Sequence, residues 1–582
     1  MARSRWRTTA GGRALVRTGA ALRGVPAALG TATLQMPGRL LIAPPDLRTH
    51  DPTVAEDILA GFYVAAGKVV QAQGQSPFTI APPSPQWESA LNGFGWLRHM
   101  RATDNPMARQ TSRTLVEDFL KLRSNKRGAA WAAPVAARRL LSFVSAAPFL
   151  LEGANLTFYR RFLRSLGQHA RYLLAGLSGS FAAEERFLPA ISICALALSS
   201  DAKPRLTRLA MRALMTEIRR CILPDGGHVN RSPRAIVEVL LDLLPLRHLL
   251  LSKNLATPEL LQVAIERMLG MLRLLRFGEG TLGLFHGTGY MPADSLAIVS
   301  RYSQGPTQTP LRARESGFER ILGGPLILLV DVGRPPPFAF SRGAHASALA
   351  FELADGPCKM IVNCGAPAVG TASAREASRH TAAHSTLVIA DTSSCRFERA
   401  VGRNVPPPAI IERPVGPNVL RELDDAGTRL TAAHSGYARR FGYLHERGIA
   451  VASDGSIVHG LDALIDADPK KPAGAVAYAL RFHLHPGVAA KLGPDGGSVT
   501  LTLASGASWR FEVAGHRILL EDSIYYAAPD GAGRTRQIVV EQHSSTSREI
   551  GWRFTRLTQA QIQLVPTMES TPVRPMSPVP AS

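Results

Sequence analysis

The sequence predicts a helical domain followed by an all-β domain, on the basis of composition and of a change in hydrophobic period. The 582 residues are 45% hydrophobic and 19% charged, which supplies a sizeable core and excludes wholesale disorder. Apolar residues recur with the helical period from about residue 50 to 310 and with a period of two after about residue 316. We therefore expect an N-terminal (α/α) toroid over residues 45–315 and an antiparallel β-sandwich over residues 316–565.

Both ends of the chain differ from these two domains in composition. Residues 1–44 are rich in Arg, Gly and Ala, and Arg13, Arg17 and Arg23 interrupt the apolar stretch that a clean signal peptide requires. We interpret this stretch as a basic arm, either disordered or amphipathic. Residues 566–582 are rich in Pro and predict a disordered tail. No apolar run reaches the ~18 residues that span a bilayer, so we expect no transmembrane segment.

Eight segments of the first domain carry apolar residues at i, i+3, i+4 and i+7. Pro52 and Pro258 each stand where a first helical turn begins. So many helices exceed a four-helix bundle, and the absence of a fixed-period repeat disfavours a regular solenoid, which leaves a toroid of helix pairs. The expected helices are Thr53–Val69, Met107–Leu122, Ala133–Phe149, Leu156–Leu174, Ala190–Leu198, Pro204–Ile222, Pro233–Leu251 and Pro258–Leu275.

The second domain shows short alternating segments separated by turn signals, of which Asp355-Gly356, Asp454-Gly455 and Asp495-Gly496 are typical of hairpins. A dozen strands at this spacing predict a large antiparallel sandwich. The expected strands are Pro325–Val332, Ala348–Leu353, Lys359–Cys364, Ser385–Ala390, Arg429–His434, Gly448–Ser453, Ser456–Leu461, Ala475–His485, Ser498–Leu503, Ser508–Val513, Ile518–Tyr526 and Arg536–Glu541.

The net charge of +22 indicates an anionic partner, and only nine of the 67 basic residues are Lys. Arg grips carboxylate, sulfate or phosphate bidentately, so a polyanionic saccharide, a nucleic acid or a membrane surface fits this composition. Codon bias is the alternative explanation for the preference for Arg over Lys. The sequence contains no P-loop, Rossmann fingerprint, HExxH or GxSxG motif, and no zinc-finger spacing or RNP-like stripe. Sequence-specific recognition of nucleic acid is therefore not expected.

Two polar, glycine-hinged loops lie between strongly helical segments. The first, Asp225–Arg231, places His228, Asn230 and Arg231 within four residues, a set that neutralises an anion and moves a proton. The second runs from Phe285 to Pro292 and offers His286 and Tyr290. The alternative for both loops is a capped connection without chemistry.

A third group lies in the β domain, where His345, Asn363 and His384 stand at the ends of three neighbouring expected strands. Such a group is compatible with Zn²⁺, but buried, hydrogen-bonded histidines are the commoner outcome. Cys364 follows Asn363 directly and is expected to face the opposite side of its strand. His483 and His485 alternate on another strand, where a packed face is the favoured interpretation over a metal pair.

Several motifs together resemble the heparinase II/III family of polysaccharide lyases, over residues of about 90 to 560. The motifs are Phe94-Gly95-Trp96-Leu97-Arg98, Ile222–Pro233 with the following Leu240–Arg247, Phe285–Gly289, Ala344–Leu353 ahead of Val362–Gly365, and Gly506–Glu521. The resemblance implies the toroid and sandwich, and β-elimination of a uronic-acid-containing acidic polysaccharide. We assign catalytic roles to His228, Arg231, His286 and Tyr290 of the two polar loops, as substitutes for family residues that this chain lacks, and substrate binding to Asn230, Arg98 and Trp96.

The chain departs from the family at four places. Residues 233–236 lack the family's Tyr acid/base, and no Asn or His neutraliser stands near Glu185–Leu188. Gly343 occupies the position of the first catalytic His, while His345 and His384 match metal-binding histidines. Asn363 replaces the metal-binding Asp, so any zinc site is degenerate, and no cofactor is expected to be required.

Two functional alternatives follow from these departures. Either other residues carry out lyase chemistry, or the chain is a catalytically degenerate carbohydrate-binding protein on the same scaffold. A nucleic-acid or anionic-membrane binder that uses the basic arm is a third hypothesis. A glycoside hydrolase is a fourth, although the helical domain shows no clear carboxylate pair. The resemblance implies the cell envelope or periplasm, and the cytoplasm is the alternative because no clean signal peptide is visible. The glycan and the oligomeric state are not predicted.

Overall fold

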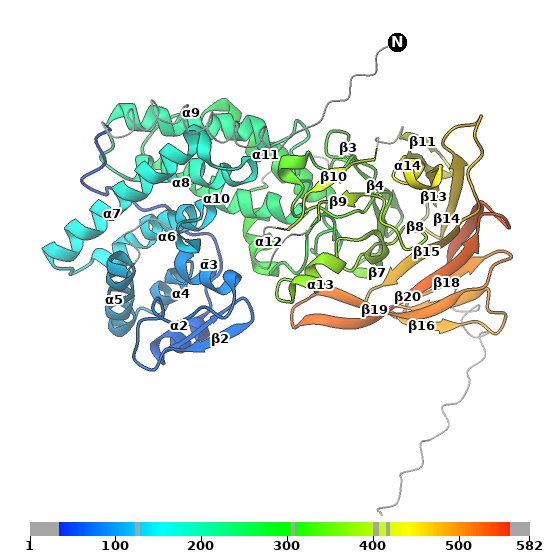
Figure 1. Ribbon diagram of the computed structural model, residues 1–582, viewed down its shortest axis with the longest axis horizontal. Helices are drawn as coiled ribbons and strands as arrows, with labels where there is room; N and C mark the ends of the chain where they lie inside the picture. The colour runs from blue at the N-terminus through cyan, green and yellow to red at the C-terminus, as the bar shows by residue number, and fades with distance from the viewer. Residues whose placement is uncertain (1–33, 123–127, 304–308, 400–406, 415–418, 559–582) are drawn as a thin grey trace, which may run out of the picture.

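The computed structural model describes residues 34–122, 128–303, 309–399, 407–414 and 419–558. The predicted basic arm lies mostly outside the described residues, and the predicted tail lies wholly outside them. Figure 1 shows a helical body formed by the first half of the chain beside a β-rich body formed by the second. The predicted fold class, helical domain first and antiparallel sheets second, is confirmed.

The helical body is built around α8 (Phe187–Ser199), which packs against α6, α7, α9 and α10 and whose residues are buried on nearly every side. Helix starts follow local chemistry, because Asp51 and Asn155 accept backbone N–H groups at two N-termini. The other helices are α2 (Pro52–Leu59), α3 (Pro85–Gly93), α4 (Leu97–Ala102), α5 (Pro106–Leu122), α6 (Ala133–Leu151), α7 (Leu156–Ala175), α9 (Pro204–Cys221), α10 (Pro233–Ser252), α11 (Glu259–Leu274) and α12 (Ala293–Ser300).

The expected helix at Thr53–Val69 is wrong in its second half. Helix α2 ends at Leu59, and the chain then forms a two-stranded hairpin, β1 (Phe62–Ala65) and β2 (Lys68–Gln71). Positive φ angles at Gly61 and at Ala66-Gly67 end the helix and make the turn, and the β-branched valines of both strands favour extended backbone. The sequence prediction also omitted α3, α4 and α12, which are short.

The β body contains two large antiparallel sheets, one with the strand order β11-β12-β13-β14-β21-β18-β17-β16 and one with β19-β20-β15-β7-β6-β5-β4-β3, to which β8 adds by pairing with β15. Short helices α13 (Ala372–Ala377) and α14 (Ala438–Phe441) lie in its loops. The strands are β3 (Arg312–Ala313), β4 (Phe318–Gly323), β5 (Leu326–Asp331), β6 (Phe351–Asp355), β7 (Cys358–Val362), β8 (Leu387–Ile389), β9 (Arg396–Phe397), β10 (Ile410–Glu412), β11 (Leu420–Asp424), β12 (Gly427–His434), β13 (Tyr443–Ala452), β14 (Ile457–Asp466), β15 (Ala477–Leu484), β16 (Ala489–Leu492), β17 (Ser498–Thr502), β18 (Ser508–Val513), β19 (Leu519–Ala528), β20 (Gly531–His543) and β21 (Glu549–Arg556).

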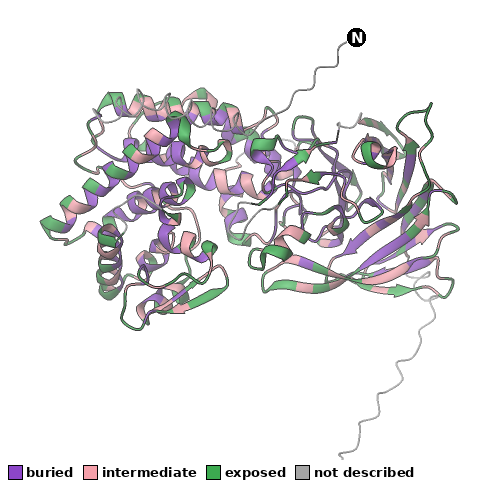
Figure 2. Ribbon diagram, in the orientation of Figure 1, coloured by how far each residue is buried: buried purple, intermediate pink, exposed green. Residues whose placement is uncertain are grey.

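One apolar core fills the space between the two sheets, and Figure 2 shows the buried residues that run along their facing sides. Phe351, Phe482 and Trp552 meet there, with ring centroids 5.2–6.0 Å apart. All three hairpins predicted from Asp-Gly pairs form, joining β6 to β7, β13 to β14 and β16 to β17. The prediction omitted β4, because Glu319 and Arg320 interrupt its apolar run although both are buried.

Helix α6 is long and apolar enough to cross a membrane by length and composition, and no other helix of the described residues passes that test. Of the most apolar 18-residue stretch of this helix, 72% is buried inside the protein. The helix therefore serves as a core element of the helical body.

Candidate functional site

The loop Asp225–Arg231 connects α9 to α10 and is tied to the β body. The two Asp225 carboxylate oxygens accept hydrogen bonds from the backbone N–H and the hydroxyl of Ser316, at 2.6 and 2.7 Å. The Asn230 side chain accepts the N–H of Ser232, the residue directly before α10. This loop therefore fixes the position of helix α10 relative to the first strands of the sandwich.

Gly226 makes this loop possible. Its φ is +88°, and a Cβ added there would lie 2.1 Å from the carbonyl oxygen of Arg267 on α11. Both the left-handed backbone and the close approach to α11 require a residue without a side chain.

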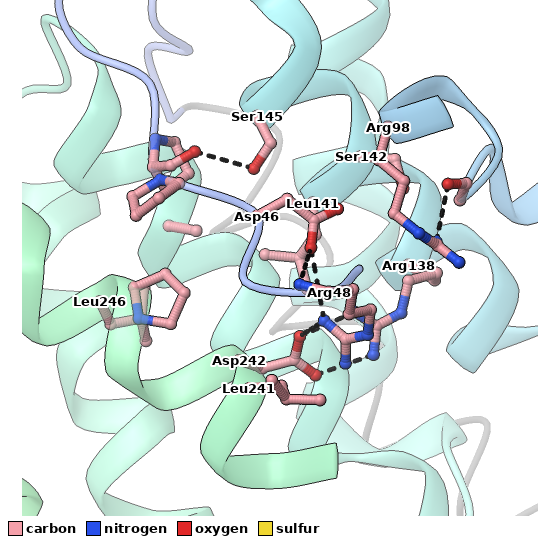
Figure 3. Close-up of a pocket in the computed structure, with 15 residues that line it drawn as sticks. Asp46, Arg48, Arg98, Arg138, Leu141, Ser142, Ser145, Leu241, Asp242 and Leu246 are labelled. Atoms are coloured by element: carbon pink, nitrogen blue, oxygen red, sulfur yellow. Dashed lines mark hydrogen bonds and ion pairs between the residues drawn. The ribbon is translucent and has the colours of Figure 1, made fainter. Parts of the chain in front are cut away.

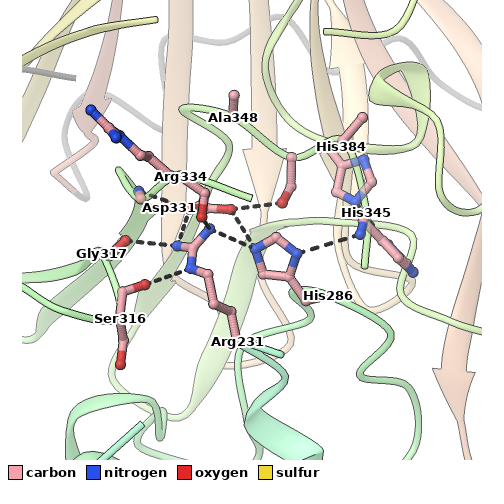
Figure 4. A network of polar contacts seen from close by, with 12 residues as sticks. Arg231, His286, Ser316, Gly317, Asp331, Arg334, His345, Ala348 and His384 are labelled. Atoms are coloured by element: carbon pink, nitrogen blue, oxygen red, sulfur yellow. Dashed lines mark hydrogen bonds and ion pairs between the residues drawn. The ribbon is translucent and has the colours of Figure 1, made fainter. Parts of the chain in front are cut away.

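A buried network joins Arg231 to the β body, as Figure 4 shows. Arg231 pairs with Asp331 at the end of β5, and it also donates to the carbonyls of Ser316 and Gly317. His286 Nε2 lies 3.0 Å from the second Asp331 oxygen, and the backbone N–H of His345 lies 3.4 Å from His286 Nδ1. The structure thus brings together Arg231, His286 and His345, three of the residues that the sequence singled out.

His286 is enclosed by polar partners on both ring nitrogens. Its Nδ1 accepts the backbone N–H of His345, and its Nε2 lies 2.9 Å from Nη1 of Arg231 and 3.0 Å from the Asp331 carboxylate. Burial first, and then the charge of Arg231, lower the pKa of His286, which keeps the ring neutral. Burial alone would raise the pKa of Asp331, but Arg231 and His286 outweigh it and hold that pKa well below its usual range.

His345 and His384 contact each other directly, with 3.1 Å between His345 Nδ1 and His384 Nε2. His384 Nδ1 lies 2.9 Å from the carbonyl of His380, to which it donates, so His384 Nε2 accepts the proton of His345. Burial lowers the pKa of His384 to about 4. Asn363 lies deeper, where its Nδ2 donates to Glu352 and its Oδ1 accepts the N–H of Ser385.

These contacts do not fit a zinc ion. The single Nε2 lone pair of His384 already accepts the hydrogen bond from His345, and a metal ligand needs a free lone pair. Within the described ranges, no group of three or more His, Cys, Asp or Glu side chains is arranged to hold a metal ion. Cys364 faces away toward His483, 3.5 Å from its Nδ1, as the strand alternation predicts. That no cofactor is required stays a prediction.

Two other predicted catalytic residues do not join this network. His228 is partly buried, its Nδ1 accepts the N–H of Asn230, and its ring stacks on Phe187. Burial lowers the pKa of His228 to about 4, so the ring is neutral. Tyr290 is half-buried, and no hydrogen bond or ring contact of its side chain occurs with the described part of the chain. Of the residues predicted to share a cleft, Arg231, His286 and His345 form one buried contact cluster, and His228 and Tyr290 lie outside it.

A separate cleft of about 740 Å³ contains the predicted substrate-binding residues Arg98 and Trp96. Its walls come from α2, the β1 hairpin, α3 and α4 on one side, and from α10 and the start of α12 on the other. Arg234, in the first turn of α10, and Met291, next to Tyr290, also line it. Asn230 is not among its lining residues.

Arg48, Arg98 and Arg138 of this cleft also line an adjoining cavity of about 30 Å³ together with Asp242, as Figure 3 shows. Arg48 and Arg138 both pair with Asp242, at 2.8 and 2.7 Å. Burial alone would raise the pKa of Asp242, but Arg138 and Arg48 lower it to about 2. Arg98 instead donates to the carbonyls of Thr49 and Gly95 through Nε and Nη1, which leaves its Nη2 without a partner in the described residues.

Sequence reasoning missed the acidic partners and the other cleft arginines. Asp331 and Asp242 lie in apolar segments, where each is an isolated charge within an expected strand or helix. A single charged residue within an apolar segment indicates a buried ion pair, and the sequence offered this signal at both positions. Arg48 and Arg138 lie far from Asp242 in sequence, and only the fold brings the three together.

Three comparisons with known proteins agree on the architecture. Residues 305–553 match the family model described as "Heparinase II/III-like, C-terminal". FtsZ-localized protein C of Caulobacter vibrioides is 30% identical over 485 residues, covering 82% of this chain and 83% of that protein. The crystal structure of heparinase III superposes with a TM-score of 0.68 at 12% identity, covering 92% of this chain and 89% of that one. Heparan sulfate lyase HepC from Pedobacter heparinus gives a TM-score of 0.56 at 15% identity, over 92% and 88%.

Proposed function

The chain belongs to the heparinase II/III-like family, and from this premise we propose that it binds a uronic-acid-containing acidic polysaccharide in the cleft that holds Arg98 and Trp96. The observation that carries the proposal is the lining of this cleft, which combines exposed arginine nitrogens with aromatic and apolar walls in about 740 Å³. A concave apolar site with a few convergent charged groups is typical of small-molecule and saccharide binding.

The charges within the cleft select for a carboxylate. Arg48 pairs with both Glu238 and Asp242, and Arg138 pairs with Asp242, so these two arginines have little charge to offer a ligand. Arg98 forms no ion pair with the described residues, and Arg234 has only a 3.7 Å contact with Glu238 at a partly exposed position. A uronate carboxylate placed between Arg98 and Arg234 gains charge-assisted hydrogen bonds that a neutral sugar cannot form.

Cleavage of the bound chain by β-elimination is the finer proposal. In that reaction a base removes the C5 proton of the uronate, the C4–O4 bond breaks, and an acid protonates the leaving O4. Tyr290 supports it, because it directly precedes Met291 and Pro292, which line the cleft. Binding without cleavage is better supported, because His286, His345 and His384 are sealed in the protein and Gly343 stands where the family has a catalytic His.

Titration calorimetry with a uronate hexasaccharide, and with a neutral hexasaccharide of the same length as its control, tests the binding proposal. Arg98→Met and Arg234→Gln are each expected to weaken uronate binding about tenfold, which is the range for a lost charge-assisted contact. Arg205→Met on α9, an exposed arginine outside the cleft, is the matched control. Equal affinity for both hexasaccharides, or no effect of either cleft variant, would overturn the proposal. Growth of the unsaturated-uronate absorbance band, lost in Tyr290→Phe, would establish cleavage.

The relative named FtsZ-localized protein C supports a second candidate, an association of this chain with FtsZ. The observation behind this candidate is the 30% sequence identity over 82% of the chain, a stretch that includes both bodies. Glycan binding favours a place in the cell envelope, whereas an FtsZ partner favours the compartment that contains FtsZ. Biolayer interferometry of the purified protein against purified FtsZ tests it, and absence of binding at micromolar concentration would exclude it.

A further inference from the structure

A second cavity, of about 870 Å³, lies between the two bodies on the side of Arg231 that faces the first strands of the sandwich. It is lined by residues of the loop before α10, of β3 and β4, of the turn after β5, and of β11. Six arginines and two glutamates are its charged residues: Arg231, Arg312, Arg314, Arg334, Arg413 and Arg421, with Glu315 and Glu319.

The positive charge is only partly neutralised. Glu319 pairs with both Arg312 and Arg421, at 2.9 and 2.7 Å. Arg314 and Arg334 are exposed and form no ion pair with the described residues. Arg413 donates to the carbonyl of Pro335 through Nε and Nη2 and forms no ion pair with the described residues, and its pKa is lowered by burial and by the nearby Arg334. The cavity therefore holds two arginines, Arg314 and Arg334, whose forks are free for an anionic ligand, and the Nη1 of Arg413.

The cavity lies between two sheet edges. β11 ends one sheet and β3 ends the other. Arg421 of β11 donates to the carbonyl of Leu311, which shows that these two edges lie close together. β11 pairs with β12 on one side, and no strand of the described chain pairs with its other side. An open edge of this kind accepts an extended peptide as an added strand.

Apolar side chains are exposed at the same edge. Leu420 and Leu423 of β11 are 59% and 77% exposed, and Leu311 is 37% exposed. Pro335, Pro336 and Pro337 line the cavity, and none of its lining residues is aromatic. The saccharide cleft, in contrast, has Trp96 and Tyr63 in its walls. Leucines, prolines and a free strand edge fit a peptide better than a sugar chain.

We propose that this cavity is a docking site for an acidic, leucine-containing segment of a partner protein, which adds as a strand to the free edge of β11 and places its carboxylates on Arg314, Arg334 and Arg413. This site is separate from the proposed saccharide cleft. Its existence does not depend on whether that cleft binds a glycan.

Fluorescence anisotropy with a labelled eight-residue peptide of alternating Glu and Leu tests this site on the full-length protein. We expect binding that weakens as salt rises, because exposed charges are screened. The double variant Arg314→Glu/Arg334→Glu should weaken binding about tenfold or more, since it reverses two charges at positions without structural partners. Arg205→Glu/Arg208→Glu on α9 makes the same change in net charge at exposed positions far from the cavity, and should leave the affinity unchanged.

Three further probes separate this proposal from its competitors. A Glu-Ser peptide, and a Glu-Leu peptide N-methylated at alternate residues, should each bind at least about fivefold more weakly, because they lack the apolar contacts or the strand hydrogen bonds. Equal weakening by both double variants, or equal binding of the Glu-Ser peptide, would overturn the proposal. Displacement of the peptide by millimolar inorganic phosphate or by a uronate hexasaccharide would also overturn it, because the cavity would then be a binding site for small oxyanions or for glycan.

Discussion

At the scale of single residues, burial decides the charge state of the polar groups that the sequence singled out. His286, His345 and His384 are 2%, 2% and 0% exposed, and each has a lowered pKa because burial penalises the imidazolium. Asp331 and Asp242 have lowered pKa values for the opposite reason, since paired arginines favour the carboxylate. The neutral histidines and the ion pairs next to them hold α10 in place. The histidines do not line an open cleft.

We predict that the variant His384→Gln reduces the loss of stability at mildly acidic pH. The pKa of His384 falls from 6.5 to about 4 on folding, so the unfolded chain binds the extra proton between these values. Stability is therefore complete above pH 6.5 and declines as pH falls toward 4. For a shift of this size the loss between pH 7 and pH 5 is about 2 kcal/mol. Urea unfolding at both pH values should show a smaller difference for His384→Gln than for the wild type.

His459→Gln is the control for this measurement, because His459 is exposed on β14. It should leave the pH 7 to pH 5 difference unchanged. An unchanged difference in His384→Gln would mean that His384 takes up its proton in the folded state, and the prediction would be wrong.

At the scale of elements, short connections carry the geometry of the candidate site. The Asp225–Arg231 loop contacts α11 through Gly226 and the sandwich through Asp225, and it ends in Arg231, whose φ is +60°. A non-glycine residue in the left-handed region costs roughly 1–2 kcal/mol and persists only where its surroundings enforce it. Here the pairing of Arg231 with Asp331 provides that enforcement.

We predict that Gly226→Ala is far more destabilising than Gly74→Ala. Both glycines have a positive φ, +88° and +80°, so both substitutions strain the backbone by about 1–2 kcal/mol. At Gly226 the added Cβ would also meet the Arg267 carbonyl at 2.1 Å, whereas at Gly74 no atom lies within 4 Å. Overpacking adds about 1–3 kcal/mol. Differential scanning fluorimetry should show the larger drop in Tm for Gly226→Ala, and equal drops would contradict the close contact.

At the scale of the whole molecule, buried polar contacts hold the helical and β bodies together. Arg320 of β4 donates to the carbonyls of Leu274 and Arg276 at the end of α11, at 2.8 and 2.7 Å. Lys359 of β7 donates to the Leu282 carbonyl, and Glu352 of β6 accepts the N–H of Leu284. These contacts join the end of α11 and the segment after it, in the helical body, to strands β4, β6 and β7 of the β body. We therefore expect the two bodies to unfold cooperatively.

We predict that Arg320→Leu separates the unfolding of the two bodies. The change leaves two buried carbonyls without their donor, which costs about 1–3 kcal/mol for each group. Differential scanning calorimetry should show one transition for the wild type and two for the variant. Arg429→Leu, a largely exposed arginine on β12, is the control and should keep one transition. A single transition in Arg320→Leu would show that other contacts suffice to couple the bodies.

The sequence by itself determined the two-part architecture, because hydrophobic period is a local property. It located α5 to α11 and most long strands, and it failed where the signal was short or mixed. The stretch 53–69 reads as one helix but contains a hairpin, and β4 carries Glu319 and Arg320 within a buried strand. Charged residues in β4 are buried only because partners from β3, β11 and α11 meet them in space.

Only the tertiary structure decided which of the candidate residues act together. Arg231, His286 and His345 are separated by 55 and 59 residues and still form one contact network. Arg98 and Trp96 belong to a different cleft, and His228 and Tyr290 lie outside the network. Residue types and loop composition identify groups capable of chemistry, but distance, burial and the identity of an ionic partner arise from long-range packing. Asp331 and Asp242 could not be assigned their arginines from sequence for the same physical reason: pairing depends on which chain segments the fold brings within about 3 Å.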